Sequence, residues 1–230
     1  MLLILSLFVA CKEVSSSDVS TSEIFATISG VSEFNTTEIK VNLNLEKEDS
    51  NTYVELAYGD TLCVQDGTET TELTHSSFAG MHSYYATLSQ SASGSQFVVE
   101  LERSSGDSAP SSVITLPNRF EIISPSWDDV VYLDQPFVIS WSIDDDVVDE
   151  MEIEIFSTCL YLDISETVGT QAGFLTINPS DWSLEDDIED ETCSADIRLT
   201  RNQQGTLDPA FDGGNVYGSF TEEITIDLVP

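Results

Sequence analysis

Apolar and polar side chains alternate with a period of two along most of the chain, a pattern typical of strands that bury one face. The runs at 39–45 and 97–101 place Ile, Val, Leu or Phe at every second position. No long stretch keeps the 3.6-residue period of a helix. The alternation therefore predicts an all-β protein.

Further short runs of the same kind are separated by turn-forming residues such as Asp66-Gly67 and Ser93-Gly94. Strands are predicted at 24–29, 53–57, 61–64, 83–88, 113–116, 120–123, 137–143, 151–155, 175–177, 195–199 and 224–228. Pro117 cannot donate to a sheet ladder and suits a linker. We therefore predict two tandem antiparallel β-sandwich domains, at 24–117 and 118–230, following a signal peptide and a Ser-rich tether.

The N-terminus carries an apolar run at 2–10 that is too short to span a bilayer and fits a secretory signal peptide at 1–10. The four residues Phe8 to Cys11 resemble the lipobox of bacterial lipoproteins, in which the cysteine becomes the lipidated first residue of the mature chain. The alternative is a simple signal peptide with an incidental cysteine. The resemblance implies lipidation of Cys11.

The segment 11–23 is rich in serine and poor in large apolar residues, which favours a flexible tether between the lipid and the folded body. In Gram-negative families an Asp directly after the lipidated cysteine directs retention at the inner membrane. This chain has Lys12 at that position. The resemblance thus implies an exported protein of the cell envelope, held at the outer membrane by its lipid.

The chain is strongly acidic, with 42 Asp and Glu against 7 Lys and Arg and a net charge of −35. Phosphate backbones are bound by clusters of Lys and Arg, so nucleic acid is excluded as a partner. The charge is typical of a well-solvated surface. Cation binding and a saline habitat are the alternatives.

The strands at 137–143 and 151–157 resemble strands B and C of an immunoglobulin-like or fibronectin type III-like sandwich. In that architecture Cys159 ends strand C and Cys193 begins strand F, which are antiparallel neighbours. Both cysteines keep the inward parity of their strands. The resemblance therefore implies a Cys159–Cys193 disulfide, with two buried free thiols as the alternative, and Cys63 is interpreted as an inert thiol.

Catalytic motifs are missing from the sequence: there is no G-x-S-x-G, H-E-x-x-H, C-x-x-C or P-loop. The only two histidines, His75 and His82, lie in a polar stretch and are interpreted as surface residues. Carboxylate pairs are too numerous to single out a glycosidase site. We therefore predict that the chain is not an enzyme.

Two acidic clusters are candidates for calcium, which takes oxygen ligands from loops. They comprise Asp144, Asp145 and Asp146, and Asp186 and Asp187. Neither has EF-hand spacing, and solvated loops are the alternative. Apart from calcium, no cofactor is predicted.

The long connection at 202–218 is a candidate binding surface, since loops at one end of a sandwich commonly carry ligands. Phe211 and Tyr217 are its candidate contacts for a glycan or an envelope protein. The alternative is a compact loop packed by its own side chains. The sequence favours a non-catalytic envelope lipoprotein that acts as a binding module, with a structural spacer or a secreted hydrolase as alternatives.

Overall fold

The computed structural model describes residues 12–33, 35–78, 81–143, 150–184 and 192–229. These residues form strands joined by turns and four short 3-10 helices, so the all-β prediction is confirmed. The 3-10 helices are η1 (Ser16–Asp18), η2 (Thr21–Glu23), η3 (Thr170–Ala172) and η4 (Pro179–Asp181). The strands of the N-terminal half are β1 (Lys12–Ser15), β2 (Ile24–Glu33), β3 (Thr36–Leu45), β4 (Thr52–Glu55), β5 (Thr61–Gln65), β6 (Thr70–Glu72), β7 (Thr74–Phe78), β8 (Met81–Leu88), β9 (Gln96–Glu102) and β10 (Ala109–Thr115). Those of the C-terminal half are β11 (Ile122–Ser124), β12 (Val130–Tyr132), β13 (Phe137–Trp141), β14 (Glu150–Ser157), β15 (Ile164–Gly169), β16 (Phe174–Ile177), β17 (Cys193–Gln204) and β18 (Gly213–Val229).

One eleven-stranded sheet runs through both halves of the molecule. Its main path is β1-β4-β3-β2-β18-β17-β14-β15, with β8 and β7 joined to β3 and with β12 beside β18. The halves meet where β18 pairs in parallel with β2, from Gly213 opposite Phe25 to Phe220 opposite Ser32. The two predicted sandwiches thus share a continuous sheet.

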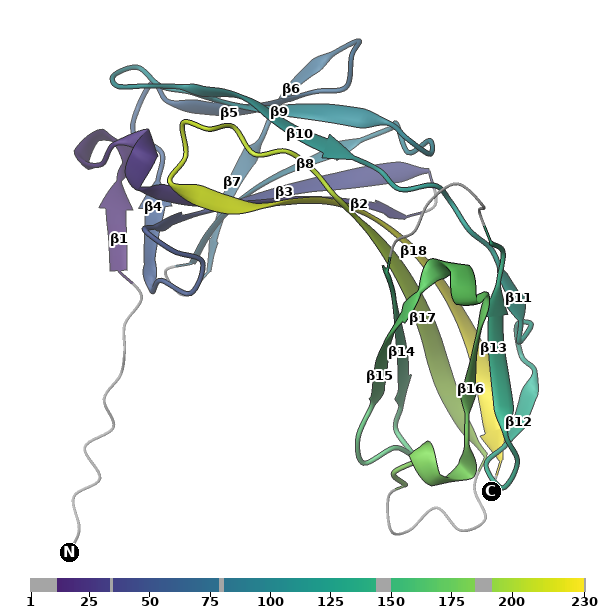
Figure 1. Cartoon of the computed structure of the whole chain (residues 1–230). Coiled ribbons are helices and arrows are strands. Elements are labelled where there is room, and N and C mark those ends of the chain that lie inside the picture. Colours follow the sequence, from purple (N-terminus) through teal and green to yellow (C-terminus); the bar gives the residue numbers. More distant parts are fainter. Residues whose placement is uncertain (1–11, 34, 79–80, 144–149, 185–191, 230) are drawn as a thin grey trace, which may run out of the picture.

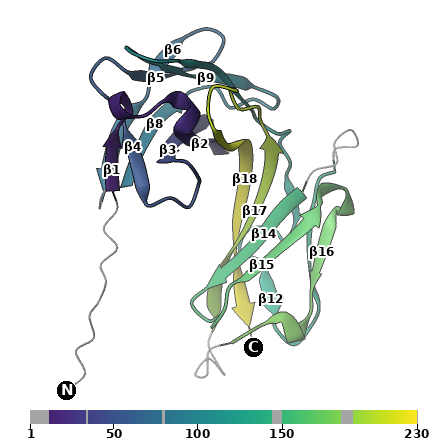
Figure 2. The same cartoon turned by 60° about the vertical axis from the view of Figure 1, so that its left-hand side comes forward.

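Two smaller sheets cover the same face of the long sheet. The sheet β10-β9-β5-β6 covers the N-terminal half and β11-β13-β16 covers the C-terminal half. Along β18, Val216 packs in the N-terminal core and Phe220 in the C-terminal core, and both point to the covered side. The molecule is bent, and the long sheet lines the inner side of the bend (Figures 1 and 2).

The hairpin of β17 and β18 carries chain from the C-terminal half into the N-terminal core. Leu207, Ala210 and Phe211 pack there, beyond the boundary predicted at 117 and 118. Thr206 exchanges two backbone hydrogen bonds with Val113 of β10, at 2.7 and 2.9 Å. A Cβ added at Gly218 would collide with the carbonyl oxygen of Thr115, so glycine permits the close crossing.

The C-terminal half has the strand arrangement implied by the sandwich resemblance. β14 pairs antiparallel with both β15 and β17, and β13 lies in the opposite sheet between β11 and β16. Trp141 on β13 is buried in the C-terminal core. Cys159 and Cys193, with Cα atoms 6.1 Å apart, form the predicted disulfide at the ends of strands β14 and β17.

The prediction of a flexible tether is wrong for residues 12–23. β1 pairs in parallel with β4, and η1 (Ser16–Asp18) and η2 (Thr21–Glu23) follow it. The Ser16 side chain is fully buried and donates to Asp60 at 2.7 Å. Ser16, which resembles part of a solvated linker in sequence, is thus the partner of a buried carboxylate.

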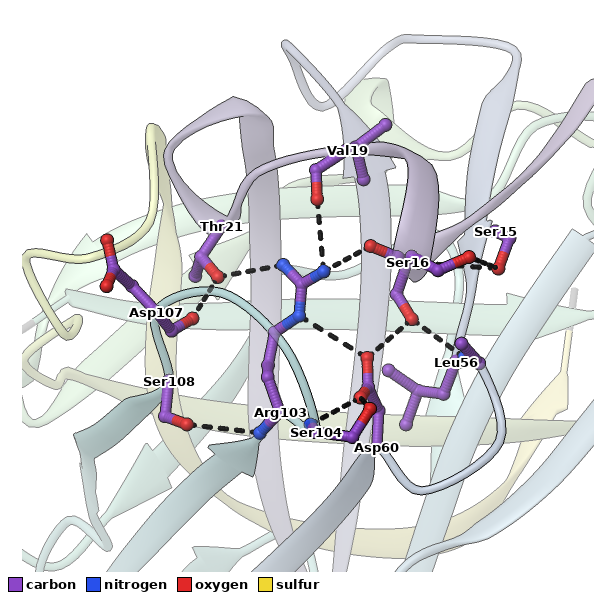
Figure 3. Close-up of polar contacts among 12 residues, drawn as sticks. Ser15, Ser16, Val19, Thr21, Leu56, Asp60, Arg103, Ser104, Asp107 and Ser108 are labelled. Atoms are coloured by element: carbon purple, nitrogen blue, oxygen red, sulfur yellow. Dashed lines mark hydrogen bonds and ion pairs between the residues drawn. The ribbon is translucent and has the colours of Figure 1, made fainter.

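Asp60 forms a buried ion pair with Arg103. The Nε atom of Arg103 lies 3.3 Å from Oδ2 of Asp60 (Figure 3). The guanidinium also donates to the carbonyl oxygens of Ser16 and Val19 and to the hydroxyl of Thr21. The other Asp60 oxygen accepts from the backbone and side chain of Ser104, each at 2.7 Å. The N-terminal segment thus supplies acceptors to both terminal nitrogens of the guanidinium and a donor to Asp60, which offsets part of the desolvation of the pair.

Candidate functional site

The uncovered side of the long sheet presents a row of polar side chains on neighbouring strands. Strand register sets Tyr217 beside Ser29 of β2 and Gln204 of β17, and Ser219 beside Val31 and Asn202. Because paired residues on adjacent strands point to the same side, these side chains share one surface. We call this surface, on the inner side of the bend, the inner face (Figure 1).

Three hollows lie along the inner face. The central one measures about 700 Å³ and a second, which shares Tyr217 with it, about 710 Å³. The third, about 340 Å³, lies over β3 and β8. The central hollow is lined mainly by hydroxyl, amide and carboxylate side chains, including Glu152, Thr200, Asn202, Gln204, Asn215 and Tyr217.

Hydrogen bonds across the strands hold the polar side chains of the inner face in place. The hydroxyl of Ser219 donates to the Asn202 amide oxygen at 2.6 Å, which leaves the amide nitrogen of Asn202 oriented away from that contact. The Asn215 amide donates to Glu48 at 3.1 Å. These contacts give the face fixed donors and acceptors, as a pre-formed polar ligand site requires.

Aromatic rings stand among the amides. Tyr53 and Tyr85 line the hollow over β3 and β8, together with Phe78, whose exposed fraction is 79%. The Lys40 ammonium lies 5.6 Å from the centre of the Tyr85 ring. Amphipathic rings beside fixed amides form a surface that can contact both the apolar and the hydroxylated sides of a ligand.

Charge on the inner face is partly neutralised by one arginine. Arg198 contacts Glu223 at 2.8 Å and Glu154 at 3.9 Å, and its guanidinium lies over the Phe156 ring. Arg198 and Lys40 are two of the seven basic residues of the chain. These two bases offset part of the negative charge of the glutamates that line the same hollows.

The structure places the two candidate contacts of the 202–218 segment differently. Tyr217 is half-buried and lines two hollows of the inner face. Phe211 is 7% exposed and packs in the N-terminal core, so its ring offers no open face to a ligand. Most of the predicted connection is strand, since β17 continues to Gln204 and β18 begins at Gly213.

The lipidation site and the calcium candidates lie outside the described residues. These are Cys11, Asp144, Asp145, Asp146, Asp186 and Asp187. Among the residues described, no helix has the length and apolar character needed to cross a bilayer. Cys63 is a half-buried free thiol, and burial raises its pKa, in keeping with an unreactive role.

The interpretation of both histidines as surface residues is wrong for His82, which is 4% exposed. Its Nδ1 lies 2.8 Å from Nε2 of His75, and its Nε2 lies 3.1 Å from a Glu13 oxygen. The parity of His82 with Tyr84 and Ala86 on β8 is the sequence signal that could have indicated burial. The pairing with His75 follows from the β7–β8 hairpin, which alternation alone does not define.

The chain matches no protein-family model and no curated protein sequence. Solved structures with a similar arrangement include a cytokine receptor complex, at 10% identity and TM-score 0.31, covering 86% of this chain and 94% of that one. A two-domain fibronectin type III segment from chicken tenascin has 9% identity, TM-score 0.27 and coverages of 90% and 99%. Fibronectin(III)-like modules of Clostridium thermocellum CbhA have 11% identity, TM-score 0.27 and coverages of 89% and 93%. At these TM-scores the fold rests on the strand pairing described above.

Proposed function

We propose that this protein is a non-catalytic binding module of the cell envelope whose inner face binds a neutral glycan chain. The observation that carries the proposal is the strand register that places Tyr217 among Asn202, Gln204 and Asn215, within a hollow of about 700 Å³. The ring can pack against the C–H face of a sugar, and the amides can pair with its hydroxyl groups.

The chemistry of the ligand follows from charge and shape. A net charge of −35 repels polyanions, and the amide and hydroxyl side chains of the face need no charged partner. The hollows follow one another over several strands, which suits an extended chain better than a compact small molecule. A basic protein is the competing occupant, because the acidic surface would attract it.

The cellular location in this proposal rests on the lipobox resemblance at Cys11. β1 begins at Lys12, so a lipid on Cys11 would hold the folded body close to the bilayer with little slack. Labelling with radioactive palmitate tests this part: label on the full-length chain and none on Cys11→Ser supports the anchor, and equal labelling of the two contradicts it.

The glycan role is tested by affinity electrophoresis of the protein in gels that contain neutral polysaccharides. Tyr217→Ala should reduce the binding free energy by about 2 kcal/mol, which is roughly a thirty-fold increase in Kd, as expected for truncation of a central aromatic contact. The variant should therefore be retained less by the polysaccharide gel. Tyr161→Ala is the matched control, because Tyr161 is 67% exposed and lines none of the hollows of the inner face.

Three results would contradict the proposal. Equal retention of the wild type and Tyr217→Ala would show that the glycan does not bind at the inner face. Absence of retention on every neutral polysaccharide, with capture of basic proteins instead, would favour a protein-binding role. Absence of both would favour a structural spacer.

A further inference from the structure

We propose that Glu55, His75 and His82 form a binding site for one divalent transition-metal ion, with zinc as the representative ion. Glu55 lies at the end of β4, and the two histidines lie on the β7–β8 hairpin. One carboxylate oxygen of Glu55 and one ring nitrogen of each histidine all lie within 4.8 Å of one another. Two imidazoles and a carboxylate are a donor set that zinc accepts.

The distances need only a small adjustment to fit an ion. Zinc binds imidazole nitrogen at about 2.0–2.1 Å, so two tetrahedral ligands lie about 3.3 Å apart. Nε2 of His75 and Nδ1 of His82 are now 2.8 Å apart, in hydrogen-bond contact. The two rings are nearly coplanar, with 4° between their planes, so binding of one ion to both nitrogens requires the exposed His75 ring to turn on Tyr84 while buried His82 provides a fixed point.

Glu13 on β1 supplies the outer contact that metal-bound histidines commonly have. Its carboxylate lies 3.1 Å from Nε2 of His82, on the opposite side of the ring from His75. A proton held on Nε2 by Glu13 leaves the lone pair of Nδ1 directed at His75, where the ion would bind. His75 then carries its proton on Nδ1 and presents Nε2 to the same ion.

A cavity of about 430 Å³ adjoins two of the three ligands. Glu55, His75 and Tyr84 line it together with Glu72 and Thr74. Three protein ligands leave one tetrahedral position for water or for a small ligand in this cavity. The nitrogen donors select a transition metal over calcium and magnesium, which prefer a set of oxygens.

The site is tested by titrating the full chain with zinc in the presence of excess magnesium, which occupies the surface carboxylates. Because the chain has two histidines, every imidazole signal in the NMR spectrum reports on the site. One zinc ion per chain should bind and shift both sets of ring resonances. His75→Ala should abolish the saturable step, and Glu13→Gln should weaken it about 10- to 100-fold.

Glu72→Gln is the matched control, since Glu72 lines the same cavity but lies outside the ligand group. It should bind zinc as the wild type does. Zinc uptake that is equal in wild type and His75→Ala, or imidazole resonances that do not move, would overturn the proposal. Loss of binding in Glu72→Gln equal to that in His75→Ala would also overturn it, because binding would then follow cavity charge alone.

Discussion

At the scale of single residues, one buried charge pair links the N-terminal segment to the rest of the fold. The side chains of Arg103 and Asp60 are 2% and 1% exposed, and the N-terminal segment contacts both. Burial by itself raises the pKa of Asp60. Hydrogen bonds from Ser104 and Ser16, together with the Arg103 charge, outweigh burial and hold the pKa of that carboxyl below its ordinary value.

Asp60→Asn should therefore destabilise the protein at neutral pH by about 3–5 kcal/mol, because it leaves a buried guanidinium without its counter-charge. A carboxyl with a lowered folded-state pKa stabilises the protein above its unfolded pKa of about 3.9, and this contribution is lost as pH falls through the folded value. The difference between variant and wild type should shrink in urea melts below about pH 4.

Asp18→Asn is the control for the effect of Asp60, because it removes an exposed carboxyl from the same segment. Its effect should stay within about 0.5 kcal/mol at every pH. An Asp60→Asn effect that is as small as this, or that does not change with pH, would show that the pair contributes little to stability.

At the scale of elements, alternation located most strands because it records a local property, the burial of one face. It failed at β1, η1 and η2, where Ser16 and Thr21 are buried through polar contacts. It also missed the full length of β17 and β18. The parts of β17 and β18 that it missed carry polar side chains to the inner face, so no run of alternating apolar residues marks them in the sequence. Tyr217 was predicted as a candidate contact, but the amides of Asn202 and Gln204 reach it through the register of the β17–β18 hairpin, which alternation alone does not define.

The disulfide links two elements whose pairing the sandwich resemblance implied. Cys159 and Cys193 are 34 residues apart, so their bond should stabilise the protein by about 3–4 kcal/mol, chiefly by restricting the unfolded chain. The double variant Cys159→Ala, Cys193→Ala should lose this amount in denaturant melts. Reductant should lower the stability of the wild type by a similar amount and leave the double variant unchanged. A reductant effect in the double variant would point to another thiol.

At the scale of the whole molecule, two cores are joined by one hairpin and one sheet. Strand β18 contributes Val216 to the N-terminal core and Phe220 to the C-terminal core. The inner face crosses this junction, so the central hollow keeps its shape only if both cores are folded. Folding of the two halves should consequently be coupled.

The tryptophans allow this coupling to be measured, because all three, Trp127, Trp141 and Trp182, lie in the C-terminal half and the last two are in its core. Phe97 is fully buried in the N-terminal core, and Phe97→Ala should cost about 3–5 kcal/mol there. If β18 couples the cores, tryptophan fluorescence will report a transition shifted by that full amount, coincident with the loss of circular dichroism from both halves. Ile153→Ala, in the C-terminal core, is the positive control for the fluorescence shift. An unshifted tryptophan transition in Phe97→Ala would mean that the halves unfold independently, and the inner face would then join two separately stable units.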